Sequence, residues 1–239
     1  MIKSNLATWL PPWRGRRPQA TSRQATPRRR WQTAWLGLTM LAIASTPSAA
    51  DIRDNDCFSE DFARRIDACT ALIDAPGTGL ADLALAYSAR ALAHSVRGNY
   101  ELAIPDYDKS LRLDPNSAVA LNNRAWAYFK LGQPERGAAD VERALDIMPD
   151  SPHTLDTRAH IRQWRGDRGG AFRDYESAIR FGGSPIIKLY QCGLQANSLY
   201  SGEIDGLYTT DTRKALEVCV ATSGCDPLPP DEECLRITS

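Results

Sequence analysis

The residues best suited to chemistry are two histidines and an aspartate in one stretch. His153, Asp156 and His160 stand at i, i+3 and i+7, which places them on one face of a helix. Imidazoles with a carboxylate could hold a metal ion or transfer protons. A catalytic zinc site also needs further ligands and a supporting shell, and the sequence offers no fourth ligand. We therefore expect a solvated edge of the molecule here.

Other signals of catalysis are missing from the sequence. It has no nucleophile elbow, no Gly-rich phosphate loop and no cysteine beside an activating histidine. None of the six cysteines has the CxxC spacing of a zinc site. They are Cys57, Cys69, Cys192, Cys219, Cys225 and Cys234. We predict that the protein is not an enzyme and has neither a cofactor nor a metal.

The first 50 residues predict export. They hold eight basic residues and no acidic one, and an apolar run over 31–44 is followed by the small residues Ser48 and Ala50. This order is typical of a secretory signal peptide over 1–50, cleaved after Ala50. The run has roughly 14 residues, whereas a spanning helix needs about 20. We expect release into the bacterial periplasm, with no membrane span after cleavage.

The chain after residue 50 is acidic and contains every cysteine. It holds 21 basic and 29 acidic residues, so it would be repelled by phosphate, and we expect no nucleic-acid partner. An even number of cysteines in an exported chain indicates disulfides.

The central region repeats with a period of 34 residues. Segments 84–117, 118–151 and 152–185 align without a gap, which predicts stacked helix pairs. The columns that set the register are Gly98, Gly132 and Gly166; Ala91, Ala125 and Ala159; and Arg90, Arg124 and Arg158. Glycine suits the left-handed turn after a helix. We predict an all-α fold of antiparallel helix pairs in a short right-handed solenoid.

These columns of small and large residues resemble those of the tetratricopeptide repeat family, over about residues 60–185. Pro115 and Pro149 stand at unit ends, as in that family, while Gly182-Gly183 and Pro105 depart from it. The resemblance implies a scaffold that binds other proteins. A helix within 51–83 would cap the amino-terminal end, with Cys57 bonded to Cys69.

A further column places an aspartate 16 residues after each repeated arginine. The pairs are Arg90 and Asp106, Arg124 and Asp140, and Arg158 and Asp174. They predict an ion pair between the two helices of each unit. Six solvated charges copied by duplication would give the same pattern.

From Ile186 onward the 34-residue pattern stops, and residues 186–239 form a segment with a Cys-rich tail. Tyr190, Gln191, Gly202, Ile204 and Arg213 contribute to a resemblance to the first half of a peptidoglycan-binding-like domain. The resemblance implies cell-wall-binding candidates at Asp205, Gly206, Tyr208 and Thr212. It also makes Cys192 and Cys219 a natural pair, leaving Cys225 to bond Cys234. The alternative is a disulfide-stapled helical cap on the last repeat.

In such a solenoid, the first helix of each unit lines a concave groove. Its inward positions predict a partner-binding surface of Asn122, Trp126, Phe129, Lys130, Asp156, His160 and Trp164. Aromatic residues are favoured at interfaces, although Trp126 and Trp164 could instead fill space between helices.

Two functions remain open, besides a hydrolase or metalloenzyme that would use the face of His153, Asp156 and His160. The first is an exported adaptor that binds an envelope protein or peptide through this groove. The second is a cell-wall module that binds peptidoglycan through residues 186–220.

Overall fold

The computed structural model describes residues 56–228, and their regular secondary structure is helical throughout. The helices are α2 (Phe62–Asp74), α3 (Leu80–Val96), α4 (Tyr100–Leu113), α5 (Ala118–Lys130), α6 (Pro134–Ile147), α7 (Pro152–Trp164), α8 (Arg168–Ala196) and α9 (Thr210–Ala221). None of the described helices is long and apolar enough to cross a membrane. The predicted signal peptide and Cys234 lie outside the described residues.

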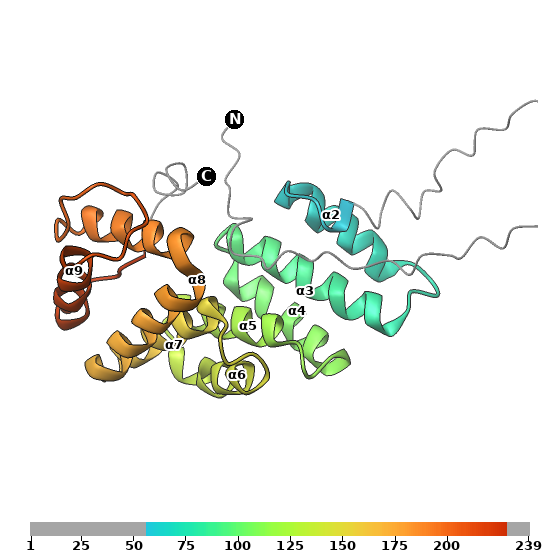
Figure 1. The fold of residues 1–239 in the computed structure, drawn as a ribbon. Helices are drawn as coiled ribbons and strands as arrows, with labels where there is room; N and C mark the ends of the chain where they lie inside the picture. The colour runs from blue at the N-terminus through green and yellow to red at the C-terminus, as the bar shows by residue number, and fades with distance from the viewer. Residues whose placement is uncertain (1–55, 229–239) are drawn as a thin grey trace, which may run out of the picture.

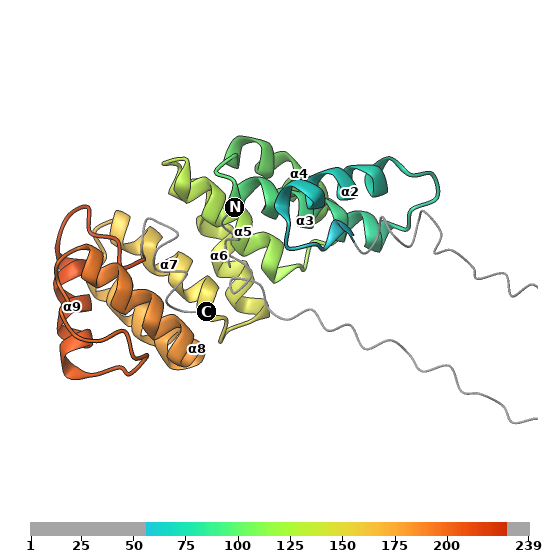
Figure 2. The same ribbon diagram turned by 90° about the horizontal axis from the view of Figure 1, so that it is seen from above.

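Consecutive helices pair and the pairs stack. α3 packs with α4, α5 with α6 and α7 with α8, while α2 packs against α3. Figures 1 and 2 show these pairs following one another along the molecule, in the order of the sequence. The predicted all-α fold of antiparallel helix pairs is therefore confirmed.

Local sequence signals place the helix ends. The three turn glycines, Gly98, Gly132 and Gly166, have φ of 77°, 70° and 81°, a conformation that glycine adopts without steric cost. The hydroxyl oxygens of Ser117 and Ser151 accept hydrogen bonds from backbone N–H groups in the first turns of α5 and α7. These caps satisfy amides that otherwise lack a partner at a helix start.

In each unit, the repeated arginine joins three helices, namely the two helices of its own unit and the helix that precedes them. Its guanidinium makes two hydrogen bonds, of 2.7–2.9 Å, to the aspartate 16 residues later. Its remaining nitrogen donates to the second helix of the preceding unit. Those acceptors are Thr70 for Arg90, Asp108 for Arg124 and Glu142 for Arg158. The predicted ion pair is confirmed, and it also links each unit to the one before it.

The repeat continues further than the sequence pattern indicated. Gly183 has a non-helical φ of 61° and divides α8 into two helical halves. Leu189 and Gly193, in the second half, lie 34 residues after Leu155 and Ala159. This half packs against α9 and is followed by a long connection over 197–209. A fourth helix pair therefore caps the array, as the expectation of a disulfide-stapled helical cap requires, and two columns of the repeat continue beyond Ile186.

The disulfides agree with one predicted pair and correct two. Cys57 is bonded to Cys69, as predicted. Cys219, in the last turn of α9, is bonded to Cys225 just beyond that helix, because Gly224 at φ 80° turns the chain back. The predicted bonds from Cys192 to Cys219 and from Cys225 to Cys234 are therefore wrong. Cys192 is also disulfide-bonded, but to none of these four cysteines.

We expect Arg124→Ala to lower the free energy of unfolding by about 2–3 kcal/mol. The change leaves the largely buried Asp140 without its bidentate partner, although partial exposure of the arginine reduces the cost. Urea denaturation followed by circular dichroism measures the loss. Arg165→Ala is the matched control, because Arg165 pairs with the exposed Glu135 at the surface. Equal effects of the two changes would contradict a structural role for the repeated arginine.

Candidate partner-binding face

Helices α5 and α7 bring three of the predicted groove residues together. The ring centroids of Trp126 and Phe129 are 5.3 Å apart, and that of His160 lies 5.2 Å from Trp126 and 5.4 Å from Phe129. The ammonium group of Lys130 is 5.4 Å from the centre of the Trp126 ring. We call Trp126, Phe129 and Lys130 the aromatic patch of α5.

The other predicted groove residues lie in different surroundings. Asn122 is buried and donates to the side chain of Asn123. Trp126 is partly buried against the carboxy-terminal core, so it does fill space between helices as well. Trp164 is 57% exposed at the end of α7 and does not have that packing role.

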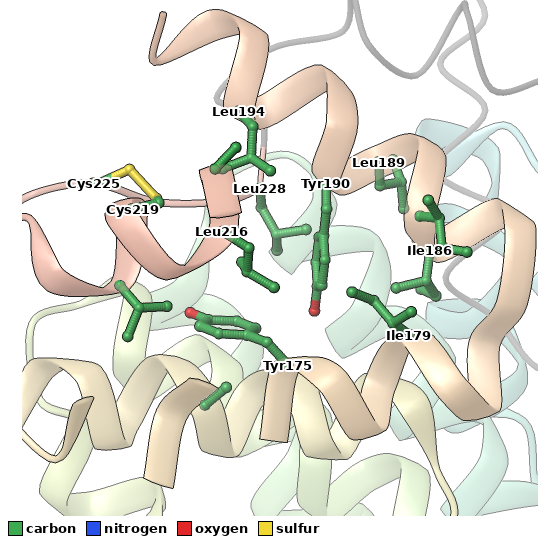
Figure 3. Packing of buried hydrophobic residues seen from close by; sticks show 14 of the residues in the cluster. Tyr175, Ile179, Ile186, Leu189, Tyr190, Leu194, Leu216, Cys219, Cys225 and Leu228 are labelled. Atoms are coloured by element: carbon green, nitrogen blue, oxygen red, sulfur yellow. A yellow bond between two sulfur atoms is a disulfide. The ribbon is translucent and has the colours of Figure 1, made fainter. Parts of the chain in front are cut away.

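The rings continue from the patch into the carboxy-terminal core. Tyr175 packs edge-on against His160 at 5.2 Å, and Tyr190 packs edge-on against Tyr175 at 5.6 Å. Figure 3 shows both tyrosines in the cluster that α8 forms with α9, near Leu216 and Leu228. The patch therefore adjoins the buried carboxy-terminal core.

A short segment after α9 covers the inward side of α7 and α8. We call these residues, Cys225–Leu228, the strap. Gln163 Nε2 donates to the Cys225 carbonyl at 2.7 Å, and Asn197 Nδ2 donates to the Asp226 carbonyl at 2.8 Å. The two amides lie 34 residues apart, at the same position of successive first helices. The strap also contacts His160, one of the positions that the sequence analysis assigned to a partner.

Gly193 gives the strap room to approach α8. A Cβ at this position would lie 2.0 Å from the carbonyl oxygen of Pro227. The same column holds alanine in the three preceding first helices, where no strap is present among the described residues. Pro227 and Leu228 are consequently buried against the helices.

His160 carries the charge that holds the strap. Its Nδ1 lies 2.8 Å from the backbone oxygen of Asp156, and its Nε2 lies 2.9 Å from Oδ1 of Asp226. A carbonyl oxygen and a carboxylate both accept, so both ring nitrogens donate and the ring is positively charged. Burial lowers the pKa of His160, but the carboxylates of Asp156 and Asp226 outweigh it and raise the pKa to about 9.

The two carboxylates differ in their surroundings. Burial raises the pKa of Asp156 to about 6, although His160 and the hydroxyl of Tyr190 oppose that shift. Tyr190 Oη donates to Asp156 Oδ1 at 2.5 Å. Burial also acts to raise the pKa of Asp226, but the hydrogen bond from His160 outweighs it and the pKa is lowered.

The expectation of a solvated edge at Asp156 and His160 is wrong. Their side chains are only 2% and 3% exposed, because Tyr190 and the strap cover them. His153 is also largely enclosed, so that burial lowers its pKa. Within residues 56–228, no group of three or more His, Cys, Asp or Glu side chains is arranged to hold a metal ion.

The four cell-wall candidates hold the connection between α8 and α9 in place. Asp205 accepts from Gln191 Nε2 at 2.8 Å, and the Gly206 N–H donates to Gln191 Oε1 at 2.9 Å. Tyr208 donates to Glu176, and Thr212 is completely buried. A separate surface hollow beside α9 is lined by Leu199, Tyr200, Ser201, Gly202, Thr209, Asp211, Lys214, Ala215 and Val218. It includes none of the four.

We predict that Gly193→Ala releases the strap while the helix pairs stay folded. The added methyl group collides with the Pro227 backbone, yet alanine favours a helix. Amide hydrogen exchange at Cys225, Asp226 and Leu228 should rise by about tenfold or more. Gly169→Ala is the control in the same helix, since a Cβ there meets only the end of the Arg173 side chain, at 3.5 Å. Unchanged strap protection in Gly193→Ala would refute this packing.

The charge pair predicts a defined pH dependence. The folded pKa of His160 is above its ordinary 6.5, so its contribution to stability is fully present below pH 6.5 and is lost as the pH rises through about 9. The contribution of Asp226, whose pKa is lowered, is present above its ordinary 3.8 and is lost in acid. The charged and titratable neighbours are Asp156, Asp226, Lys130, Tyr175 and Tyr190.

Nuclear magnetic resonance of the His160 ring, assigned with His160→Gln, measures its pKa directly. We expect titration near pH 9 in the wild type and a clearly lower value in Asp226→Asn. A wild-type pKa near 6.5 that Asp226→Asn does not move would show that the pair is absent in solution.

Comparisons with known proteins bear on the repeat region. Among solved structures, the chain is similar to one described as "Crystal structure of MamA", with 15% identity and a TM-score of 0.40, over 56% of this chain and 94% of that chain. No curated protein matches the sequence. Residues 84–117 match a family described as Tetratricopeptide repeat, and residues 106–137 match a second family with the same description. The two matches support the presence of tetratricopeptide repeats within residues 84–137.

Proposed function

We propose that this chain is an exported adaptor that binds a protein or peptide partner through the first helices of its repeats. Tetratricopeptide repeats are typically scaffolds without catalytic activity that bind proteins, and residues 84–137 match that family. The observation that carries the proposal is the aromatic patch of α5, with Lys130 exposed beside Trp126.

The chemistry of the patch suits a peptide that has both apolar and acidic side chains. The stacked rings of Trp126 and Phe129 supply a large contact area that is already ordered, which limits the entropy lost on binding. The Lys130 ammonium lies against the tryptophan ring and can still accept an acidic partner group. Trp164 extends the surface at the end of α7.

Export is supported by two independent features. Residues 1–50 have the composition and order of a signal peptide. Two disulfides lie within residues 56–228, and such bonds persist in oxidising compartments such as the periplasm. We therefore propose that the partner is an envelope protein.

A non-enzymatic role is consistent with the buried polar cluster. His160 is held by Asp156 and Asp226, and Asp156 is also bonded to Tyr190. These groups bond one another and are covered from solvent. They stabilise the array at the point where the strap attaches.

The second candidate function is cell-wall binding through residues 186–220. The hollow beside α9 supports it, because Tyr200, Asp211 and Lys214 combine an aromatic ring with polar groups, as a sugar would require. Asp205, Gly206 and Thr212 support the alternative of a structural cap, since each bonds within the segment or is buried there. Co-sedimentation of the mature chain with purified peptidoglycan tests this candidate.

We predict that Trp126→Ala together with Trp164→Ala removes at least nine-tenths of partner binding. The measurement is capture by the purified mature chain from an envelope extract, with each recovered protein quantified. Phe181→Ala is the matched control, because Phe181 is 51% exposed but lies on α8 outside the face. Circular dichroism establishes that all variants are folded. Equal recovery of every protein by the wild type and the double variant would contradict the proposed function.

A further inference from the structure

Two side-chain amides bind the strap through its backbone. Gln163 and Asn197 hold two successive backbone carbonyls, those of Cys225 and Asp226. Tyr175 Oη donates to Gln163 Oε1 at 3.0 Å, which turns the NH₂ group of that amide toward the strap. Contacts to the backbone do not depend on which side chain the bound segment carries. They hold the main chain of the strap across the first helices.

Three features near these amides do select side chains. The positively charged His160 ring takes a carboxylate at Asp226, whose Oδ1 also accepts the Leu228 N–H at 2.8 Å. Pro227 is buried beside Gly193, where there is no space for a helix side chain. Leu228 enters the apolar cluster with Tyr190 and Leu216, as Figure 3 shows. The surface therefore fits an aspartate followed by proline and a large apolar residue.

We propose that the strap occupies a binding site for a partner segment with the order Asp-Pro-apolar, and that such a segment displaces the strap. This inference rests on the proposed adaptor function and specifies the chemistry of the partner. The site consists of His160, Gln163, Gly193 and Asn197. It adjoins the aromatic patch of α5, because Trp126 and Phe129 both contact His160.

The tether gives the strap an advantage that a partner must overcome. The bond between Cys219 and Cys225 attaches the strap directly to α9, and a short tether corresponds to an effective concentration in the millimolar range. A partner of four residues could not compete. A longer segment gains contacts on Trp126, Phe129 and Lys130, so only a partner that also occupies the patch opens the site.

The test uses the full mature chain and a fluorescent peptide of residues 223–230 with alanine for the cysteine, Ser-Gly-Ala-Asp-Pro-Leu-Pro-Pro. The host variant Asp226→Asn weakens the strap and leaves His160 for the peptide carboxylate. A second host adds Cys219→Ser and Cys225→Ser to remove the disulfide, so that the strap is attached to α9 only through residues 222–224. We expect fluorescence anisotropy to show the weakest binding to the wild type and the tightest to the second host.

The control peptide carries asparagine in place of aspartate. We expect the second host to bind the aspartate peptide at least tenfold more tightly, and His160→Gln in that host to remove the difference. Equal affinity for the two peptides, or binding of neither, overturns the proposal. So does dimerisation of the second host in sedimentation, because the strap would then dock on a second copy.

These outcomes are distinct from failure of the adaptor function. If Trp126→Ala with Trp164→Ala abolishes capture but the peptides bind equally, the adaptor function stands and the Asp-Pro-apolar site falls. If the aspartate peptide is preferred but capture is unchanged, the site exists and the adaptor function fails.

Discussion

The arrangement of the whole array depends on one guanidinium group in each unit. Arg124 binds both oxygens of Asp140 on its own second helix and also reaches Asp108 on the second helix before it. A planar group with fixed donors holds these three helices at one spacing. Because the contact recurs every 34 residues, it also fixes which residues of each first helix are turned away from the second helices. The aromatic patch of α5 is one result.

The same contact explains why the array ends where it does. Glu176 occupies the acceptor position of Asp108 and Glu142, but the next arginine position holds Cys192. Arg213 of α9 donates to Glu176 instead, at 3.0 Å, together with Tyr208. Arg213, on the second helix of the fourth pair, thus takes the place of the repeated arginine, and the series of these contacts ends there. The chain beyond α9 is then free to return across the inward side of the array as the strap.

The repeat was predictable because its causes are local. Each turn glycine, each small residue and each Arg-Asp pair acts within one helix pair, and three copies make the columns visible. The fourth pair was predicted as a helical cap but not as a continuation of the repeat, because Cys192 and the long connection interrupt the pattern, although Leu189 and Gly193 continue it. The burial of His160 could not be foreseen, since its partner Asp226 lies 66 residues away. The predicted disulfides of the tail were wrong for a related reason. A turn at Gly224, outside the repeat, brings Cys225 back to Cys219.

The inward face changes in character along the array, and this constrains how a partner could lie on it. His160 and Leu194, which lie at the strap, share a repeat position with Leu92 and Trp126 of the earlier units. Gln163 and Asn197 share another repeat position with Ser95 and Phe129. At the second of these positions, the side chain is an amide that binds the strap backbone only in the third and fourth helix pairs, at Gln163 and Asn197. On α5 the same positions are aromatic and select apolar side chains. A partner that follows the strap's contacts therefore places its carboxylate and proline over α7 and α8, and its remaining apolar residues over α5.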